Sequence, residues 1–171
     1  MGCPYHRPLA RGCACAALCP GARCDTSGTI RTLDQAKSVR ASGAQFIVSP
    51  SLVDEIGEYC LAENIPFYPA TMTAGEVQRA YALGLREVKF FLASLAGGVP
   101  MLRAFSSVFR EMRFMPNGGV PAANLAEFLT RPSVLACGRS WLTPKEAVAI
   151  GDYSQITTLA SEAVAIAAQA R

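Results

Sequence analysis

Lys89 is the one cation in an apolar, strand-like stretch, EVKFFLASLAGG (87–98). Alternate side chains of a strand point to opposite faces, so Lys89 shares a face with Phe91, while Val88 and Phe90 share the other. On an interior face, desolvation disfavours the charged ammonium and lowers its pKa. A neutral amine attacks ketones, and the resulting Schiff base is an electron sink for carbon–carbon cleavage. The alternative is a structural lysine at a rim, with its stem on apolar surface or its ammonium paired with a carboxylate.

Two later segments carry glycines in a context that suits phosphate binding. Glycine stands between a strand-like run and a helix-like run in both MPNGGVPAANL (115–125) and LACGRSWLTPKEA (135–147). Without a Cβ, backbone N–H groups come close to a phosphate, and the start of the following helix adds a favourable dipole. The pattern predicts one phosphate held between these two units. Tight strand-to-helix turns are the alternative explanation for the same glycines.

Alternating strand-like and helix-like runs, which begin at about residue 25, must position these groups. The strand-like runs recur about every 21 to 24 residues, which is typical of βα units in a parallel sheet. They lie near Phe46, Phe67, Phe90, Phe114 and Leu135. The predicted helices span 51–64, 73–84, 97–109, 121–131, 143–151 and 153–169. Continuous apolar strands indicate a sheet covered on both faces.

Local signals mark three of the helix ends. Thr73 and Glu76 form a capping-box pattern, and Thr143, which a proline follows, repeats the pattern at a later helix. Gly84 is typical of the residue just after a helix. These signals predict helices that begin after Thr73 and Thr143 and one that ends before Gly84.

The equal length of the units favours a barrel of βα units over an open, doubly wound sheet. Five strands are clear and a short further one is expected at 27–30, whereas a closed eight-unit barrel takes about 200 residues or more. We therefore predict an α/β fold, an incomplete (β/α)8 TIM-barrel domain over residues 26–171. Chemistry in this architecture gathers at the C-terminal ends of the strands. These ends carry Thr29, Pro50, Thr71, Thr73, Lys89, Phe91, Asn117, Gly118, Gly119, Gly138 and Ser140.

Residues 1–25 differ from the rest of the chain. They hold five of the seven cysteines and the only histidine, His6. A zinc site is one interpretation, but Cys13 and Cys15 are one residue apart and no second pair of ligands follows. We therefore expect no metal site and interpret the cysteines as reduced thiols of a cytoplasmic protein. The segment is predicted to be an atypical leader, non-native or poorly ordered.

Composition and charge exclude several classes of function. The chain is 51% hydrophobic and 17% charged, which favours a buried core over disorder. Its net charge is +3 and its 16 basic residues are scattered along the sequence, so no nucleic-acid partner is expected. No uninterrupted apolar segment reaches the ~18 residues of a membrane-spanning helix, so no membrane partner is expected either.

Several motifs together resemble one enzyme family. They are GAQFIVSP, IPFYPATMT, VKFFLAS, RFMPNGGV, VLACGRSW and GDYSQIT, in this order between residues 26 and 171. The combination is similar to the 2-keto-3-deoxy-6-phosphogluconate aldolases, which are also 4-hydroxy-2-oxoglutarate aldolases. The resemblance implies a class I aldolase on a (β/α)8 barrel, forming a homotrimer without metal or organic cofactor. Such an enzyme cleaves a phosphorylated keto-deoxy sugar acid to pyruvate and glyceraldehyde 3-phosphate in the Entner–Doudoroff pathway.

The same resemblance implies roles for individual positions. Lys89 takes the place of the family's Schiff-base lysine, and Phe91 that of the aromatic residue after it. Thr29 and Pro50 fall on positions around the pyruvoyl part of the substrate, and Asn117 on a threonine near its carboxylate. The positions implied to bind phosphate are Gly118, Gly119, Gly138, Arg139 and Ser140.

The chain also departs from the family pattern in ways that bear on activity. Asn117 and Arg139 replace a threonine and a glycine, and Leu92 replaces a proline. The family's EVTLRT-like segment, whose glutamate acts as general acid and base, has no counterpart upstream of residue 26. We therefore expect a truncated or frame-shifted member with its first two βα units missing or replaced and with weak or no aldolase activity. The alternative is a catalytically impaired remnant that binds phosphosugar or only oligomerises.

Overall fold

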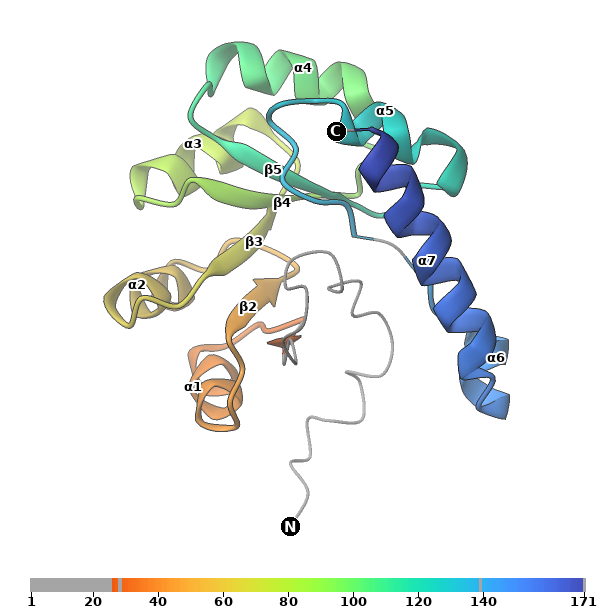
Figure 1. Cartoon of the computed structure of the whole chain (residues 1–171). Coiled ribbons are helices and arrows are strands. Elements are labelled where there is room, and N and C mark those ends of the chain that lie inside the picture. The colour runs from red at the N-terminus through yellow and green to blue at the C-terminus, as the bar shows by residue number, and fades with distance from the viewer. Residues whose placement is uncertain (1–25, 28, 139, 171) are drawn as a thin grey trace.

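The computed structural model describes residues 26–27, 29–138 and 140–170, and Figure 1 shows strands and helices alternating along them. The strands are β1 (Thr26–Ser27), β2 (Phe46–Ser49), β3 (Phe67–Thr71), β4 (Glu87–Phe91) and β5 (Arg113–Asn117). The helices are α1 (Leu33–Ala41), α2 (Asp54–Ala62), α3 (Ala74–Ala82), α4 (Gly98–Val108), the 3-10 turn η1 (Ala122–Asn124), α5 (Leu125–Leu129), α6 (Lys145–Ile150) and α7 (Tyr153–Gln169). The predicted leader, with His6 and its cysteines, lies outside the described residues.

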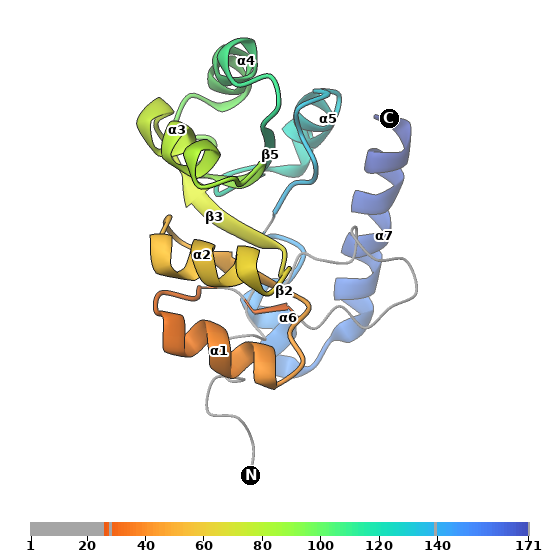
Figure 2. The ribbon, with the colours of Figure 1, turned by 90° about the vertical axis from the view of Figure 1, so that its left-hand side faces the viewer.

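The five strands form one parallel sheet in which each strand pairs with the next in sequence. This order confirms the predicted succession of βα units and differs from a doubly wound sheet, in which the strand order reverses. The sheet curves, and helices α1 to α4 lie along its outer side (Figures 1 and 2). A curved parallel sheet with its helices outside is part of a barrel wall, so the predicted α/β fold of incomplete (β/α)8 type is confirmed.

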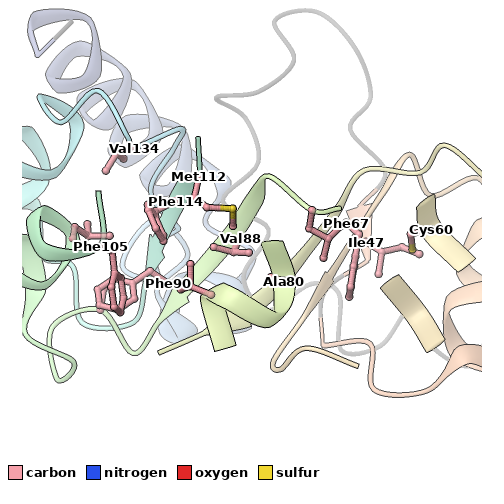
Figure 3. Close-up of a cluster of buried hydrophobic side chains, with 14 of the residues drawn as sticks. Ile47, Cys60, Phe67, Ala80, Val88, Phe90, Phe105, Met112, Phe114 and Val134 are labelled. Atoms are coloured by element: carbon pink, nitrogen blue, oxygen red, sulfur yellow. The ribbon is translucent and has the colours of Figure 1, made fainter. Parts of the chain in front are cut away.

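The larger hydrophobic core fills the space between the strands and the outer helices (Figure 3). The strands contribute fully buried side chains to it, among them Ile47, Val88, Phe90 and Phe114. Phe105 of α4 meets the Phe90 ring edge-on and stacks on the Phe114 ring, with centroids 5.8 Å apart in both pairs. These ring contacts fix α4 against β4 and β5.

A second, smaller core lies on the inner face of the strands. It consists of Phe46, Tyr68, Met115 and Ala136, and the first two rings meet edge-on with centroids 5.8 Å apart. Residues of the two cores alternate along the strands, as the two-residue period of a strand requires. Both faces of the sheet are therefore apolar, in agreement with the continuous apolar runs in the sequence.

The helix-end signals are confirmed in two cases and wrong in one. The Glu76 N–H donates to the Thr73 hydroxyl at 3.3 Å and the Glu76 carboxylate accepts from the Thr73 N–H at 2.8 Å, which is the predicted capping box of α3. Gly84 follows the same helix with φ of 96°. Thr143 does not cap α6. The residue at the N-cap position of this helix is Pro144, whose side chain cannot accept a hydrogen bond.

Helix α1 has no counterpart among the predicted helices. It begins after Thr32, whose hydroxyl accepts a hydrogen bond from the Gln35 N–H at 3.3 Å. Its buried residues are Ala36 and Val39, both small. A helix that buries so little apolar surface lacks the strong apolar repeat from which helices are predicted.

The last predicted strand, near Leu135, is not formed as a regular strand. Its segment makes two isolated parallel bridges to β5, one between Phe114 and Val134 and one between Asn117 and Gly138. Within the described residues no strand pairs with its other side.

Helix α7 matches the predicted span and lies on the side of the molecule away from α1 to α3 (Figures 1 and 2). It packs against α5 and α6. None of its residues is fully buried, and Tyr153 and Val164 are 70% and 56% exposed. Neither α7 nor any other helix in the described part of the chain combines the length and apolar character needed to span a membrane.

Candidate active site

Lys89 lies in the middle of β4 and its side chain is on the inner face of the sheet. The residues on either side of it, Val88 and Phe90, are fully buried in the larger core, so alternation directs Lys89 the other way. Its ammonium nitrogen is 4.2 Å from the centroid of the Phe91 ring. The predicted sharing of a face by Lys89 and Phe91 is therefore confirmed.

Apolar groups flank Lys89 on both neighbouring strands. Its partners in register are Ala70 of β3 and Met115 of β5, and both are buried. Burial lowers the pKa of the Lys89 ammonium below the ordinary value of 10.5, because desolvation disfavours the charged form. At a given pH, more of this amine is neutral, and therefore nucleophilic, than of an exposed lysine.

No carboxylate neutralises Lys89 in the part of the chain that the structure describes. Neither of the two ion pairs formed there involves it. Glu87, the acid on the same face of β4, is two residues earlier, which places it about 7 Å away along the strand. A lysine paired with a carboxylate, one of the structural alternatives, is therefore not what the described residues show.

Two buried hydroxyls hold the ends of neighbouring strands. The Ser49 hydroxyl donates to the Ile30 carbonyl at 2.7 Å, and the Thr71 hydroxyl donates to the carbonyl of Lys89 itself at 3.4 Å. Both residues are almost inaccessible. Thr71 and Thr73, predicted from sequence to lie at strand ends, thus serve the backbone: the first holds β4 and the second caps α3.

The loop after β5 requires glycine at two consecutive positions. Gly118 and Gly119 have φ of 91° and 71°, a region that favours glycine. A Cβ at Gly118 would lie 3.2 Å from the Leu92 Cα, and one at Gly119 would lie 2.9 Å from the Ser94 Cβ. The loop therefore approaches the segment after β4 too closely for any larger residue.

Hydrogen bonds tie this loop to the segment after β4. The Ala93 N–H donates to the Asn117 carbonyl at 2.9 Å, and the Ser94 N–H donates to the Gly118 carbonyl at 3.2 Å. The Ser94 hydroxyl donates to the Gly119 carbonyl. The carbonyls of the loop are thus occupied, while the Gly119 N–H donates to no residue that the structure describes.

Asn117 and Gly138 bring the two glycine-bearing segments together. Besides their bridge, the Gly138 N–H donates to the Pro116 carbonyl at 2.8 Å. A Cβ at Gly138 would collide with the side-chain amide of Asn117, so any larger residue here displaces that amide. The two segments are therefore adjacent, as predicted, and their role in phosphate binding stays a prediction.

Thr29 and Pro50 lie at the same edge of the sheet as Lys89. Thr29 is exposed after β1 with φ of 65°, and Pro50 is half-buried after β2. Ser49 pairs with Pro69, so Pro50 is in register with the next residue of β3, Ala70, which pairs with Lys89. Pro50 and Lys89 therefore lie level with each other on either side of β3. At the usual strand spacing it lies about 10 Å from Lys89 across the sheet, and Thr29 lies farther.

The last two phosphate candidates differ in what the structure describes. Arg139 lies outside the described residues, so its contact with phosphate stays a prediction. Ser140 is exposed, and its carbonyl accepts a hydrogen bond from the Thr143 N–H at 3.3 Å. This bond turns the chain toward α6 and leaves the Ser140 side chain at the surface.

Sequence reasoning missed Ser94. Its hydroxyl bonds to the glycine loop and its Cβ sets the closest approach of Gly119. The available signal is its place, a small hydroxyl residue just beyond the C-terminal end of a parallel strand, where such architectures collect binding residues. Cys60 is a fully buried core residue of α2, and burial raises the pKa of its thiol to about 11, which keeps it unreactive.

Comparison with known sequences finds one family. A family model described as KDPG and KHG aldolase, that is, 2-keto-3-deoxy-6-phosphogluconate and 4-hydroxy-2-oxoglutarate aldolase, matches residues 20–159. The 2-dehydro-3-deoxy-phosphogluconate aldolase of Treponema pallidum is 41% identical over 140 residues, which cover 82% of this chain and 67% of the relative. The KHG/KDPG aldolase of Escherichia coli K12 is 41% identical over 138 residues, covering 81% and 65%. The chain thus spans about two thirds of the length of these curated relatives.

Solved structures of aldolases also superpose on the chain. The 2-keto-3-deoxy-6-phosphogluconate aldolase of Zymomonas mobilis ZM4, solved with 3-phosphoglycerate, superposes with a TM-score of 0.77 at 35% identity and covers 86% of this chain and 68% of that one. The KDPG aldolase of Legionella pneumophila, with pyruvate captured as a covalent carbinolamine, gives a TM-score of 0.75 at 38% identity, covering 78% and 65%.

Proposed function

The chain belongs to the KDPG and KHG aldolase family, and we propose that it is a class I aldolase with Lys89 as its nucleophile. The observation that carries this proposal is the state of Lys89, a partly desolvated amine with a lowered pKa and without a carboxylate partner among the described residues. Such an amine is suited to forming a Schiff base. The Legionella relative, which holds pyruvate as a covalent carbinolamine, supports the same chemistry.

The proposed reaction begins when the neutral Lys89 amine attacks the ketone carbon of a phosphorylated keto-deoxy sugar acid. Loss of water from the carbinolamine leaves a protonated imine, which withdraws electrons from the carbon chain. A proton is removed from the hydroxyl on the second carbon from the imine carbon. The bond between that hydroxyl-bearing carbon and the carbon next to the imine then breaks, which releases glyceraldehyde 3-phosphate and leaves an enamine. Protonation of the enamine and hydrolysis of the imine release pyruvate and restore the amine.

The side chains around Lys89 are proposed to hold the pyruvoyl part of the substrate. The Phe91 ring lies against the ammonium and excludes water from that side of the imine. Asn117, one strand across at the end of β5, offers an amide N–H to the substrate carboxylate. Thr29 and Pro50, at the same sheet edge, are proposed to line the pyruvoyl pocket.

The phosphate is proposed to bind where the two glycine-bearing segments meet. The Gly119 N–H makes no hydrogen bond to a described residue and is therefore available to a phosphate oxygen. The other proposed contacts are Gly118, Gly138, Arg139 and Ser140. The presence of 3-phosphoglycerate in the Zymomonas relative supports a phosphate ester as ligand.

Slow turnover of the isolated chain is part of the proposal. The cleavage requires a group that removes and returns protons beside the imine, and no described carboxylate lies within ion-pair distance of Lys89. Positioned proton transfer contributes about 10²–10⁴-fold to a rate. Imine formation by Lys89 is therefore expected to be retained while the carbon–carbon cleavage is slow.

A second candidate function is phosphosugar binding without turnover. The observation that favours it is the glycine loop after β5, whose shape is set by backbone bonds to residues 93 and 94 and does not involve Lys89. In that case phosphosugars stabilise the chain against heat but no covalent adduct forms. A thermal-shift measurement beside the activity assay separates the two functions.

We also propose that the chain associates with itself, as the family resemblance implies for a homotrimer. Tyr153 and Val164 of α7 are 70% and 56% exposed, and an interface between copies is proposed to cover them. Light scattering coupled to size-exclusion chromatography measures the mass directly.

Release of pyruvate from 2-keto-3-deoxy-6-phosphogluconate tests the proposed function. We expect slow release by the unaltered chain, none by Lys89→Ala, and an unchanged rate for Lys145→Ala, a control at the start of α6. If Lys89→Ala retains the original rate, Lys89 is not the nucleophile. If the chain matches the rate of the Escherichia coli relative, the proposed slow step is contradicted.

A further inference from the structure

A groove of about 880 Å³ lies at the end of the sheet where β5 begins, opposite to the strand ends that carry the candidate active site. It is lined by the C-terminal part of α4, the connection to β5, the first residue of β5 and the turn after α5. Four arginines meet there, and we refer to the site as the arginine groove: Arg103, Arg110, Arg113 and Arg131. The fold thus gathers basic residues that look scattered in the sequence.

The arginines of the groove form no ion pair with a residue that the structure describes, although Glu87 lies opposite Arg113 in the register of β4 and β5. The acid in its lining is Glu111, whose carboxylate accepts a hydrogen bond from the Tyr81 hydroxyl at 2.9 Å and lies 3.7 Å from the Arg86 Nε. Arg86 in turn stacks on the Tyr81 ring, 4.0 Å from its centroid. Glu111 is therefore engaged by residues outside the groove, and neither ion pair in the described part of the chain includes a groove arginine.

One polar donor among the residues that line the groove is left without an acceptor. The Arg131 Nε is buried and has no hydrogen-bond partner among the described residues. The hydroxyls of Ser106 and Ser133 also line the groove, but they are 2.7 Å apart and Ser106 has the Leu102 carbonyl as a second partner at 2.7 Å, so they are satisfied. A buried donor without an acceptor is unfavourable, and it shows that the polar groups around the groove are incompletely paired.

We propose that the arginine groove binds a small anion that carries two or more phosphate groups. Arginine presents a planar fork of N–H donors that matches phosphate oxygens in bidentate contacts. Each guanidinium carries five N–H donors, so four of them offer more donors than one phosphate accepts, and a diphosphate or bisphosphate uses more of the set. The volume falls in the range of about 300–1,000 Å³ that is usual for small-molecule sites.

This site is separate from the one that contains Lys89 and does not depend on the proposed aldolase function. Arg113 begins β5 and Asn117 ends it, so the groove and the glycine loop are about 13 Å apart along that strand. A ligand in the arginine groove therefore leaves Lys89 and the glycine loop free.

Titration calorimetry of the full chain with inorganic pyrophosphate, and in parallel with orthophosphate, tests the proposal. We expect one equivalent of pyrophosphate to bind, more tightly than orthophosphate. In the double variant Arg110→Ala/Arg113→Ala we expect affinity to fall about tenfold or more, because two charge-assisted contacts are lost. Both side chains are exposed, so circular dichroism is expected to show an unchanged fold.

The double variant Arg31→Ala/Lys145→Ala is the matched control, because it removes two exposed positive charges outside the groove. Its affinity for pyrophosphate is expected to equal that of the unaltered chain. Equal weakening in this variant and in Arg110→Ala/Arg113→Ala shows diffuse charge attraction and overturns the proposal. Unchanged affinity in Arg110→Ala/Arg113→Ala also overturns it. Arg131→Lys keeps the charge but loses the fork, and we expect weaker binding of pyrophosphate than in the unaltered chain.

Discussion

The two faces of β4 differ in packing and in charge. On the outer face, Val88 and Phe90 have no exposed surface and lie in the larger core. On the inner face, Lys89 and Phe91 are half-buried and form a cation–ring contact. Because side chains alternate along this strand of five residues, its outer-face residues pack in the core and its inner-face residues are placed for chemistry. Substitutions one position apart are therefore expected to have different consequences.

The largest expected effect comes from the outer face. Phe90→Ala removes a fully buried ring that contacts Phe105, and we expect the free energy of unfolding to fall by about 3–5 kcal/mol because a cavity remains. Urea denaturation measures this loss. Leu95→Ala is the control, because Leu95 is 83% exposed and its truncation is expected to change stability little.

A smaller effect is expected in the glycine loop beside the inner face. In Gly119→Ala the residue keeps a positive φ and its Cβ meets Ser94, so we expect a loss of about 1–3 kcal/mol in stability. We also expect phosphosugars to give no thermal stabilisation in this variant. Gly75→Ala is the matched change in α3, where the new Cβ meets nothing within 4 Å, and it is expected to stabilise slightly. A Gly119→Ala variant that behaves like Gly75→Ala contradicts the assigned role of the loop.

The smallest expected effect is the pH dependence that Lys89 gives to stability. Its folded-state pKa is lowered, so between that pKa and about 10.5 the unfolded chain binds more protons than the folded one. Stability from this group therefore rises with pH across that window. Comparison of urea denaturation at about pH 7 and about pH 10 is expected to show a small gain that Lys89→Met lacks. An equal gain in both proteins means that Lys89 is not desolvated.

Most of the fold was predictable from the sequence because its signals are local or periodic. The spacing of apolar runs predicts the parallel order of β2 to β5, and the alternation within β4 predicts the face that Lys89 shares with Phe91. The capping box at Thr73 acts within one helical turn, so the sequence contains all of it.

The features that were missed depend on contacts between distant segments. Helix α1 buries only small residues, so its apolar pattern is weak. Ser94 gains its role from the glycine loop some 25 positions later in the chain. The arginine groove combines residues from 103 to 131 that have no shared motif and meet only when α4, β5 and the turn after α5 fold together.

Reduction of an imine with borohydride tests the central claim most directly. The full chain is incubated with pyruvate and borohydride, and the modified peptide is identified by mass spectrometry. We expect one stable adduct, located on Lys89, and no adduct in Lys89→Ala, while Lys145→Ala is modified as the unaltered chain is. The absence of an adduct, or an adduct on another lysine, contradicts the assignment of Lys89 as the Schiff-base nucleophile.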